Sequence, residues 1–392
     1  MKKHAFNLAA AALALALSFV SCDAGWSDKY NKNKTNNDGG GAKVGAKNAK
    51  PAATNTEVSD ASAMQPTMEG ASDAPAMQPA MEGGGSGVYV ACSDLDNSGR
   101  SVRSWLWKSG VAQTLNSAAS DTGSVFVYGG DVYVAGTVGT STSASGSYIE
   151  SSATLWKNGV PQTLSSPTSA AASVFVSGGD VYVVGAVDPG GGQFATLWKN
   201  GSAQTLSSPA SAASSVYVSG GNVYVAGWTR GKFGNRNDYR ATLWKNGAAQ
   251  TLSSTESAAR SVFVSGNDVY VAGHVNDRAT LWKNGVPQTL SSAASRAASV
   301  FVSDNDVYVA GWEGSGALGK DPDMRATLWK NGVAQTLGSK ESYANSVFVS
   351  GGDVYVAGEV GNDQSARATL WKNGSAQTLS NTRSRTRSVY VK

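Results

Sequence analysis

The sequence predicts an all-β fold, a seven-bladed β-propeller, from three observations. A segment of the form Ala-Thr-Leu-Trp-Lys-Asn-Gly recurs at intervals of 38 to 49 residues, and its Trp stands at seven positions: Trp107, Trp156, Trp198, Trp244, Trp282, Trp329 and Trp371. Each copy is followed by Gln-Thr-Leu, an eight-residue connector and a Ser-Val-(Phe/Tyr)-Val segment, and the first six continue with a short turn and a Val-Tyr-Val segment. The folded part, 87–392, gives roughly 44 residues per repeat, which is typical of propeller blades.

Four short strands can be predicted in each repeat. In one repeat they are Ser173–Val176, Val181–Val184, Ala195–Trp198 and Gln204–Leu206. Their β-branched and aromatic residues favour strands, and no stretch has the helical period. Asn-Gly follows the Trp-Lys in six repeats, and the slightly altered first copy has Ser109-Gly110. Asn-Gly tolerates positive φ at both turn positions, so it predicts a tight hairpin.

The two ends of the repeat series also support the propeller. It begins with a second strand at Val88 and finishes with a first strand at Ser388–Val391. The strands balance only if the C-terminal strand pairs with the N-terminal one, which closes the ring and removes an open edge. We therefore predict a propeller closed by its own C-terminus.

Topology then predicts two different faces. The turns between strands 1 and 2 and between strands 3 and 4 share one face, the bottom face. The loops between strands 2 and 3 and the connectors between blades share the other, the top face. The strand 2–3 loops vary from five residues in His274–Arg278 to sixteen in Thr137–Ser152. Near-identical repeats with one variable loop suggest a displayed binding surface, although neutral drift of these loops explains them equally simply.

Composition places limits on the function. The formal charge of the whole chain is +4, and removal of Lys2 and Lys3 with a leader gives 4 − 2 = +2, too little to indicate a nucleic-acid partner. Of the two cysteines, Cys92 stands where other repeats have Gly, which predicts a small core residue. No metal-ligand spacing is present, so we expect neither a metal nor a cofactor.

Residues 1–22 have the pattern of a secretory signal peptide. Lys2, Lys3 and His4 precede an apolar stretch from Ala5 to Val20, which is too short for a stable membrane span. The stretch ends in Phe-Val-Ser-Cys, which resembles a bacterial lipobox, with Phe19 in place of the usual Leu. The resemblance implies lipidation (palmitate) of Cys22, a membrane anchor and a cell-envelope location, periplasmic or at the cell surface. An ordinary signal peptide with an incidental Cys is the alternative.

Residues 23–86 have the composition of a disordered low-complexity linker. A Lys/Asn/Gly run is followed by the octet Ala63–Gly70, which recurs with one change at Ala76–Gly83. Such a segment buries too little apolar surface to offset its ordering entropy. We expect it to hold a monomeric propeller away from the lipid surface.

The strand order resembles that of the kelch and galactose-oxidase class of propellers, in which the closing strand is also the innermost. The single Gly136, Gly185 and Gly227 depart from the Gly pair of kelch repeats. The Trp-Lys-Asn-Gly and Val-Tyr-Val-Ala-Gly units are similar to those of bacterial cell-envelope proteins. That resemblance implies an envelope role and no particular activity.

Candidate ligand-binding residues lie where the repeats diverge on the top face. We predict that exposed aromatics beside Arg and Asn bind a sugar ring or a protein. The candidates come from the strand 2–3 loops and from positions just before strand 1: Trp228, Arg230, Phe233, Tyr239, Arg260, His274, Arg296, Trp312, Asn345 and Arg387. The alternative is that the aromatics pack on a neighbouring blade.

We therefore expect a membrane-anchored binding module for a glycan or a protein, and not an enzyme. A scaffold subunit in envelope assembly is one alternative. A glycosidase-like hydrolase is another, using top-face carboxylates such as Asp238, Asp277, Glu313 or Asp321. On the bottom face, the repeated Lys of the Asn-Gly turns forms a ring that is either solvated or attractive to anionic lipid. The repeated Asp before strand 2 is expected to cap its own backbone.

Overall fold

The computed structural model describes residues 87–392, except for 98, 117–118, 143–147, 191, 208–209, 234–235, 315–322 and 363. The predicted signal peptide, the lipidation site Cys22 and the predicted linker lie outside the described residues. In the described part no helix is long and apolar enough to cross a membrane.

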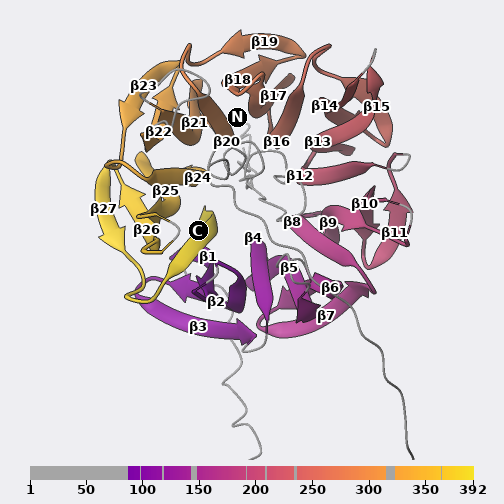
Figure 1. Ribbon diagram of the computed structural model, residues 1–392, viewed down its shortest axis with the longest axis horizontal. Helices are drawn as coiled ribbons and strands as arrows, with labels where there is room; N and C mark the ends of the chain where they lie inside the picture. Colours follow the sequence, from indigo (N-terminus) through magenta and orange to yellow (C-terminus); the bar gives the residue numbers. More distant parts are fainter. Residues whose placement is uncertain are drawn as a thin grey trace, which may run out of the picture. The chain divides into compact units, whose positions relative to one another are not determined.

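The described chain forms seven four-stranded antiparallel sheets arranged as blades around a common axis (Figure 1). Blade 1 consists of β28 (Ser384–Val391), β1 (Val88–Leu95), β2 (Ser101–Lys108) and β3 (Val111–Asn116). Blade 2 consists of β4 (Ser120–Tyr128), β5 (Asp131–Thr142), β6 (Tyr148–Lys157) and β7 (Val160–Ser165). Blade 3 consists of β8 (Ser169–Ser177), β9 (Asp180–Val187), β10 (Phe194–Lys199) and β11 (Ser202–Thr205).

The remaining four blades repeat this order. Blade 4 consists of β12 (Ser211–Ser219), β13 (Asn222–Phe233), β14 (Arg236–Lys245) and β15 (Ala248–Thr251). Blade 5 consists of β16 (Ser257–Ser265), β17 (Asp268–Val275), β18 (Arg278–Lys283) and β19 (Val286–Thr289). Blade 6 consists of β20 (Ser295–Ser303), β21 (Asp306–Gly314), β22 (Met324–Lys330) and β23 (Val333–Thr336). Blade 7 consists of β24 (Ser342–Ser350), β25 (Asp353–Val360), β26 (Arg367–Lys372) and β27 (Ser375–Thr378).

The predicted closure of the ring is confirmed. β28 pairs with β1 in register, with Tyr390 opposite Tyr89. Gly87 and Lys392 add a reciprocal pair of backbone hydrogen bonds of 3.2 and 3.0 Å at the end of this pairing. The first strand of each repeat is innermost, and the outer strands form the rim (Figure 1).

The blades pack through aromatic and aliphatic side chains contributed at the same strand positions. Six of the seven repeat tryptophans, all except Trp107, are among the largest fully buried side chains. Each innermost strand also supplies one buried aromatic, and neighbouring ring centroids lie 4.7–5.1 Å apart in a closed belt: Phe126, Phe175, Tyr217, Phe263, Phe301, Phe348 and Tyr390. Burial raises the pKa of Tyr217 and of Tyr390 to about 12. Apolar burial on both faces of every sheet is what stacked blades require.

A ring of serines also links neighbouring blades. The innermost strand lies at the edge of its sheet, so one of its amide groups needs an acceptor outside the sheet. In blade 3, the Val174 amide donates to the hydroxyl of Ser124 in blade 2. The same bond recurs between every pair of neighbouring blades, at 3.0–3.4 Å, with acceptors Ser124, Ser173, Ser215, Ser261, Ser299, Ser346 and Ser388.

The glycine after each Val-Tyr-Val-Ala is fixed by a bulge in the innermost strand. In blade 4 the register of β12 shifts between Ala213 and Ser215, which leaves Ser214 as the bulged residue. The bulge brings the Ala212 carbonyl so near that a Cβ on Gly227 would lie 2.1 Å from it. In blade 4 a Cβ at this position would therefore require the bulge to shift. In blade 1 Cys92 takes this position; it is fully buried, as predicted, and burial raises its pKa well above the usual value.

The bottom face is nearly the same in every blade. The Asn of each Asn-Gly turn has positive φ, 51° at Asn158 for example, as the tight hairpin requires. The expectation that the repeated Asp caps its own backbone is wrong: Asp131 accepts hydrogen bonds from Asn158 at 2.7 Å and from Lys157 at 2.8 Å. Five such Lys–Asp pairs form, at 2.7–2.8 Å, and lower the pKa of each aspartate. All seven lysines also lie over a Tyr ring of their own blade. The lysine ring is therefore largely neutralised within the blades.

Candidate ligand site at the channel mouth

The candidate site lies at the top ends of the innermost strands, above the aromatic belt. These strands begin with the same buried Ser and reach the same Ser-Val-(Phe/Tyr)-Val segment. Of the three positions in between, the middle one is always Ala or Thr, and the two on either side of it, the first and second variable positions, differ most. The first position holds Asp121, Ala170, Ala212, Ala258, Arg296, Tyr343 or Arg385. The second is the bulged residue and holds Gly123, Ala172, Ser214, Arg260, Ala298, Asn345 or Arg387.

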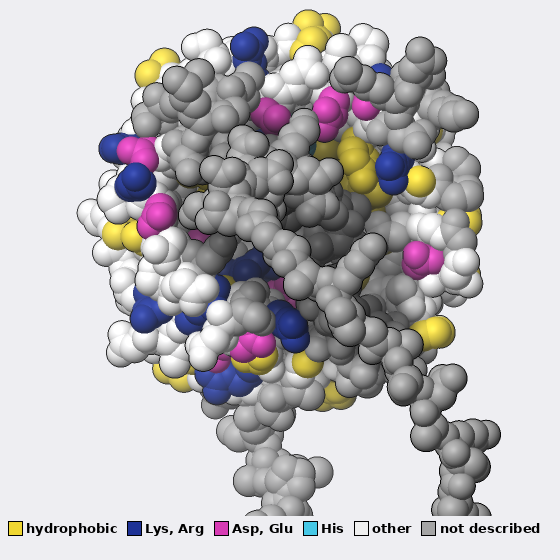
Figure 2. Space-filling view, in the orientation of Figure 1, with side chains coloured by type: hydrophobic (Ala, Val, Ile, Leu, Met, Phe, Trp, Pro, Cys, Tyr) yellow, Lys and Arg dark blue, Asp and Glu magenta, His cyan; other side chains and the backbone are white. Residues whose placement is uncertain are grey.

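These two positions divide the ring into two unequal parts. In blades 3 and 4 they hold only Ala and Ser. Blades 5, 6, 7, 1 and 2 are contiguous, and each contributes at least one charged or large polar side chain. We call this set, Arg260, Arg296, Tyr343, Asn345, Arg385, Arg387 and Asp121, the polar arc. In Figure 2, basic and acidic side chains gather near the centre of the ring over blades 7 and 1.

Arg387 and Asp121 form the centre of one half of the arc. Arg387 is only 3% exposed and its Nη2 lies 2.8 Å from Asp121 Oδ2, across the boundary between blades 1 and 2. The hydroxyl of Ser93 donates to the other carboxylate oxygen of Asp121 at 2.7 Å. Burial alone would raise the pKa of Asp121, but Arg387, Arg385 and the bond from Ser93 outweigh it and hold the pKa below its ordinary value.

Glu359 extends this half of the arc into blade 7. It follows the strand 2 glycine of β25, and its carboxylate accepts a hydrogen bond from Asn345 at 2.9 Å. Asn345 also donates to the Thr386 carbonyl at 2.9 Å, which ties blade 7 to blade 1. Burial raises the pKa of Glu359, and the two arginines Arg385 and Arg387 only partly offset this effect. The pKa of Asp121 is therefore lowered and that of Glu359 is raised, although both carboxylates lie near the same two arginines, Arg385 and Arg387.

In the other half of the arc, Arg260 and Arg296 are near enough to His274 to affect its pKa. His274 is 8% exposed. It lies in β17 between Ala258 of β16 and Ala279 of β18. Burial lowers its pKa well below the ordinary value, and the positive charges of Arg296 and Arg260 lower it further. His274 is therefore a neutral imidazole at neutral pH.

The predicted aromatics have different environments. Trp228 is only 7% exposed, so the expectation of an exposed stacking surface there is wrong. The predicted strand 2–3 loop that follows it is largely an extension of β13 and β14, and Trp228 packs edge-on against Tyr239 with centroids 4.8 Å apart. Arg230 pairs with Tyr239 on the opposite strand of the hairpin, and its guanidinium carbon lies 5.5 Å from the centroid of the Tyr239 ring. The side chain of Phe233 is outside the described residues.

Trp312 is half-buried, as is Tyr239. It pairs with Arg296 across β20 and β21, and its ring meets Tyr343 of blade 7 edge-on, with centroids 6.3 Å apart. The structure thus places Arg296 and His274 at the boundary between blades 5 and 6, and the Trp312 ring at the boundary between blades 6 and 7. Asn345 and Arg387 lie at the boundary between blades 7 and 1.

The carboxylates named for a hydrolase are engaged by nearby side chains. Asp238 pairs with Arg240 at 3.6 Å, Asp277 pairs with Arg296 at 2.9 Å, and Glu313 accepts a short hydrogen bond from Ser291. Asp321 lies outside the described residues. Among the described His, Cys, Asp and Glu side chains, no group of three or more is arranged to hold a metal ion.

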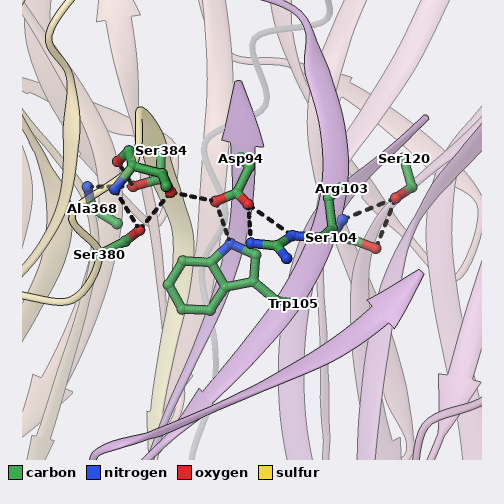
Figure 3. Close-up of polar contacts among 9 residues, drawn as sticks. Asp94, Arg103, Ser104, Trp105, Ser120, Ala368, Ser380 and Ser384 are labelled. Carbon is green, nitrogen blue, oxygen red and sulfur yellow. Dashed lines mark hydrogen bonds and ion pairs between the residues drawn. The ribbon is translucent and has the colours of Figure 1, made fainter. Parts of the chain in front are cut away.

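Sequence reasoning missed Asp121, Arg385 and Tyr343. Each stands at the first variable position of an innermost strand, and alignment of the seven strands on their shared Ser would have revealed them. Sequence reasoning also missed the cluster at the seam of blade 1 (Figure 3). There Asp94 accepts from the Trp105 indole at 3.0 Å, from Arg103 and from Thr382 of the C-terminal segment at 3.2 Å. The bond from Thr382 links the C-terminal segment to the first strand, and the other two lie within the N-terminal hairpin.

No protein-family model and no curated protein sequence matches the chain. Solved structures do match it. A puromycin-hydrolyzing peptidase of Mycobacterium tuberculosis is 15% identical with a TM-score of 0.50, and the match covers 76% of this chain and 52% of the peptidase. The chain thus spans about half the length of that enzyme.

Two archaeal proteins are also similar. The β-propeller domain of the trilobed protease of Pyrococcus furiosus is 10% identical with a TM-score of 0.49, covering 76% of this chain and 93% of the domain. An acylaminoacyl peptidase of Pyrococcus horikoshii is 13% identical with a TM-score of 0.47, covering 75% of this chain and 50% of the peptidase.

These comparisons correct one expectation. We expected from the sequence that the chain is not an enzyme, because no catalytic pattern stood out. The propeller fold is, however, shared with a peptidase, which overturns the exclusion of hydrolases. At this level of identity the likeness concerns the fold alone.

Proposed function

We propose that the chain is a binding module whose ligand, a glycan or a protein, docks at the channel mouth on the polar arc. The observation that carries this proposal is the distribution of residues on the innermost strands. Seven strands share their serines and their belt aromatic, yet five contiguous blades carry charged or large polar groups at the two variable positions. A ligand at the channel mouth would contact the arc side chains that are partly exposed, and Arg387, only 3% exposed, is not one of them.

Folding does not require the polar arc. Blades 3 and 4 have Ala170, Ala172, Ala212 and Ser214 at the same positions, and they make the same serine bonds and the same belt contacts. Removal of charged groups from water costs free energy. Alanine or serine at these positions, as in blades 3 and 4, avoids this cost and still gives the same blade structure. Their presence supports a role in recognition.

The bottom face supports this choice by contrast. Its Lys, Asp, Asn and Tyr side chains satisfy one another within each blade, as Lys283, Asp268 and Asn284 do in blade 5. Exposed ion pairs of this kind contribute little to stability and present little net charge. We therefore assign the ligand to the top face.

The proposal extends to the location of the module. Residues 1–22 would direct export, a lipid on Cys22 would anchor the chain in the bacterial envelope, and residues 23–86 would act as a tether. Cys22→Ala should move the protein from the membrane fraction to the soluble fraction. A wild-type chain without acyl label would overturn the anchor and leave the binding proposal intact.

The experiment that tests binding is a screen of the purified full chain on glycan and protein arrays. Wild type should give at least one saturable signal that an Arg385→Gln variant weakens by tenfold or more. Array ligands are then incubated with the protein and analysed for cleavage, which would identify a hydrolase. If no array ligand binds and protease treatment of intact cells spares the protein, an internal scaffold in envelope assembly replaces the binding module.

A further inference from the structure

The β13–β14 hairpin of blade 4 stands above the neighbouring blade on the top face. In blade 5 the pairing of strands 2 and 3 ends at Val275–Arg278, where a two-residue turn joins the strands. In blade 4 the equivalent pair is Thr229–Arg240, and the pairing continues for four more pairs, to Phe233–Arg236. At the rise of an antiparallel strand, these pairs lift the hairpin about 13 Å above blade 5. The top face therefore has a step between blades 4 and 5.

The raised part of this hairpin has only two strands. On its inner side, β12 pairs with β13 as far as Thr229, and one further backbone bond of 2.6 Å joins the Arg230 amide to the Ala210 carbonyl. On its outer side, the last backbone bond joins the Leu252 amide to the Ala241 carbonyl at 2.8 Å. Above these bonds, no described strand pairs with either edge of the hairpin. Open strand edges of this kind accept an extended polypeptide as an added strand.

Arg230 is exposed on one face of the hairpin and is supported by an aromatic stack. Its guanidinium carbon lies 5.5 Å from the centroid of the Tyr239 ring, and Tyr239 in turn packs edge-on against the buried Trp228. Among the side chains that the structure describes, no carboxylate pairs with Arg230. A side chain that is already held in place loses less conformational entropy when it binds a partner.

The face that carries Arg230 looks toward blade 5. In blade 6 the residue equivalent to Trp228 is Trp312, and its ring meets Tyr343 of the following blade. Trp228 therefore faces the blade that follows it, which is blade 5. Arg230 stands two residues further along β13, on the same face, because alternate residues of a strand share a face.

Arg278 of blade 5 faces the same boundary from the other side. His274 is equivalent to Trp312, so it and its cross-strand partner Ala279 face blade 6. Arg278 precedes Ala279 in β18 and therefore points to the opposite face, toward blade 4. It is exposed, and no described carboxylate pairs with it. The exposed Glu256 of the connector between these blades forms no ion pair with a described arginine.

We propose that the step between blades 4 and 5 docks an extended acidic segment of a partner protein. The segment lies along the β13–β14 hairpin as an added strand, and its carboxylates pair with Arg230 and Arg278. Two exposed arginines at one boundary complement negative charge, and guanidinium groups bind carboxylates through parallel N–H donors. Opposite charges on adjacent strands stabilise the added strand further. The open edges favour a polypeptide, because its backbone can continue the sheet and that of a glycan cannot. This surface lies outside the polar arc, so the inference goes beyond the proposed function.

The test uses an acetylated and amidated peptide of four Thr-Glu repeats as the acidic probe, and the same peptide with Gln for Glu as the neutral probe. Titration calorimetry on the full chain at low salt should show that the acidic peptide binds about tenfold tighter or more. Arg230→Gln and Arg278→Gln should each weaken its binding by about tenfold or more. Arg325→Gln removes the exposed arginine equivalent to Arg278 in blade 6 and should change binding less than about twofold. Equal binding of the two peptides, or no binding of the acidic one, would overturn the inference.

Two further measurements separate the proposed contacts from indirect effects of the substitutions. The double variant Arg230→Glu, Arg278→Glu should reject the acidic peptide and bind a peptide of four Thr-Lys repeats more tightly than wild type does. Failure of this charge exchange in a folded double variant would contradict direct ion pairing. In wild type, amide hydrogen exchange in the hairpin should slow when the acidic peptide binds, because its free edge becomes paired. Unchanged exchange with saturating peptide would rule out an added strand, whatever the variants do.

The remaining outcomes identify other occupants. Tetragalacturonate that binds at this step as tightly as the acidic peptide would replace the polypeptide by an acidic glycan. A dimer in sedimentation that the acidic peptide does not dissociate, and that Arg230→Gln abolishes, would replace the partner protein by a second copy of the chain. Peptide binding that is lost in Arg385→Gln and kept in Arg230→Gln would place the peptide on the polar arc, which overturns this inference and leaves the proposed function.

Discussion

The amide of Val125 in blade 2 donates a 3.2 Å hydrogen bond to the hydroxyl of Ser388, the fifth residue from the C-terminus. It is one of the seven equivalent serine bonds between blades, and it is the one that crosses the seam. Ser388 and Val125 are both fully buried. The ring is therefore closed by a side chain of the last strand as well as by its backbone.

Ser388→Ala should leave the Val125 amide buried without its acceptor. Loss of a buried partner costs about 1–3 kcal/mol, so the free energy of unfolding in urea should fall by that amount. Ser375→Ala, which removes an exposed hydroxyl on the rim strand β27, is the matched control and should change it by less than about 0.5 kcal/mol. Equal effects of the two substitutions would mean that the seam bond has no energetic role.

Deletion of Ser388–Lys392 should destabilise the propeller far more than Ser388→Ala. It removes the pairing of β28 with Val88–Ala91, the seam serine and Tyr390 of the aromatic belt. We expect a loss of several kcal/mol, on the scale of a broken core. A melting temperature within about 1–2 °C of wild type would show that the C-terminal strand does not close the ring.

Gly227→Ala tests the reason for the repeated glycine. The new Cβ would lie 2.1 Å from the Ala212 carbonyl oxygen, so the bulge of β12 must shift, at a cost of about 1–3 kcal/mol. The control is Gly221→Asn, because blade 6 already has Asn305 at the equivalent turn position with φ 68°. Urea unfolding should show a large loss for the first and little change for the second. Tolerance of alanine at 227 would contradict the close approach.

His274 predicts a pH dependence of stability. Its pKa in the folded protein lies well below that of an unfolded chain, about 6.5, because of burial and the neighbouring Arg296 and Arg260. Above about pH 6.5 neither state is protonated; below it the unfolded state binds a proton that the folded state does not, so stability falls as pH falls. Wild type should therefore lose up to about 1.4 kcal/mol per pH unit more than His274→Gln between pH 6.5 and the folded pKa. Parallel pH profiles of the two proteins would show that His274 is not buried in its neutral form.

The blade count, the strand order, the ring closure and the buried Cys92 were predictable from the sequence. They depend on spacing and period, which repeat seven times and so reinforce one another. The serine ring and the reason for Gly227 were not predictable, because both depend on a bulge that sequence patterns do not reveal.

The candidate site was predicted only in part. Arg260, Arg296, Asn345 and Arg387 were found because they interrupt a small-residue pattern just before strand 1. Trp228 was misplaced because the hairpin of β13 and β14 is longer than the predicted strands, which buries the indole against Tyr239. Alignment of the seven strands reveals Asp121, but its pairing with Arg387 joins segments that are distant in sequence and was not predictable. The effect of Arg385 and Arg387 on Glu359 likewise acts between neighbouring blades.

The most direct test of a top-face binding module compares one substitution on each face with the same ligand. Arg385→Gln removes a charge of the polar arc, and Lys283→Gln removes a bottom-face charge of blade 5 that pairs with Asp268. Both proteins, shown to be folded by their melting curves, are titrated with the array ligand that wild type binds best. The account predicts at least a tenfold loss of affinity for Arg385→Gln, or about 1.4 kcal/mol, and less than a twofold change for Lys283→Gln. A larger loss for Lys283→Gln would contradict it and place the ligand on the bottom face.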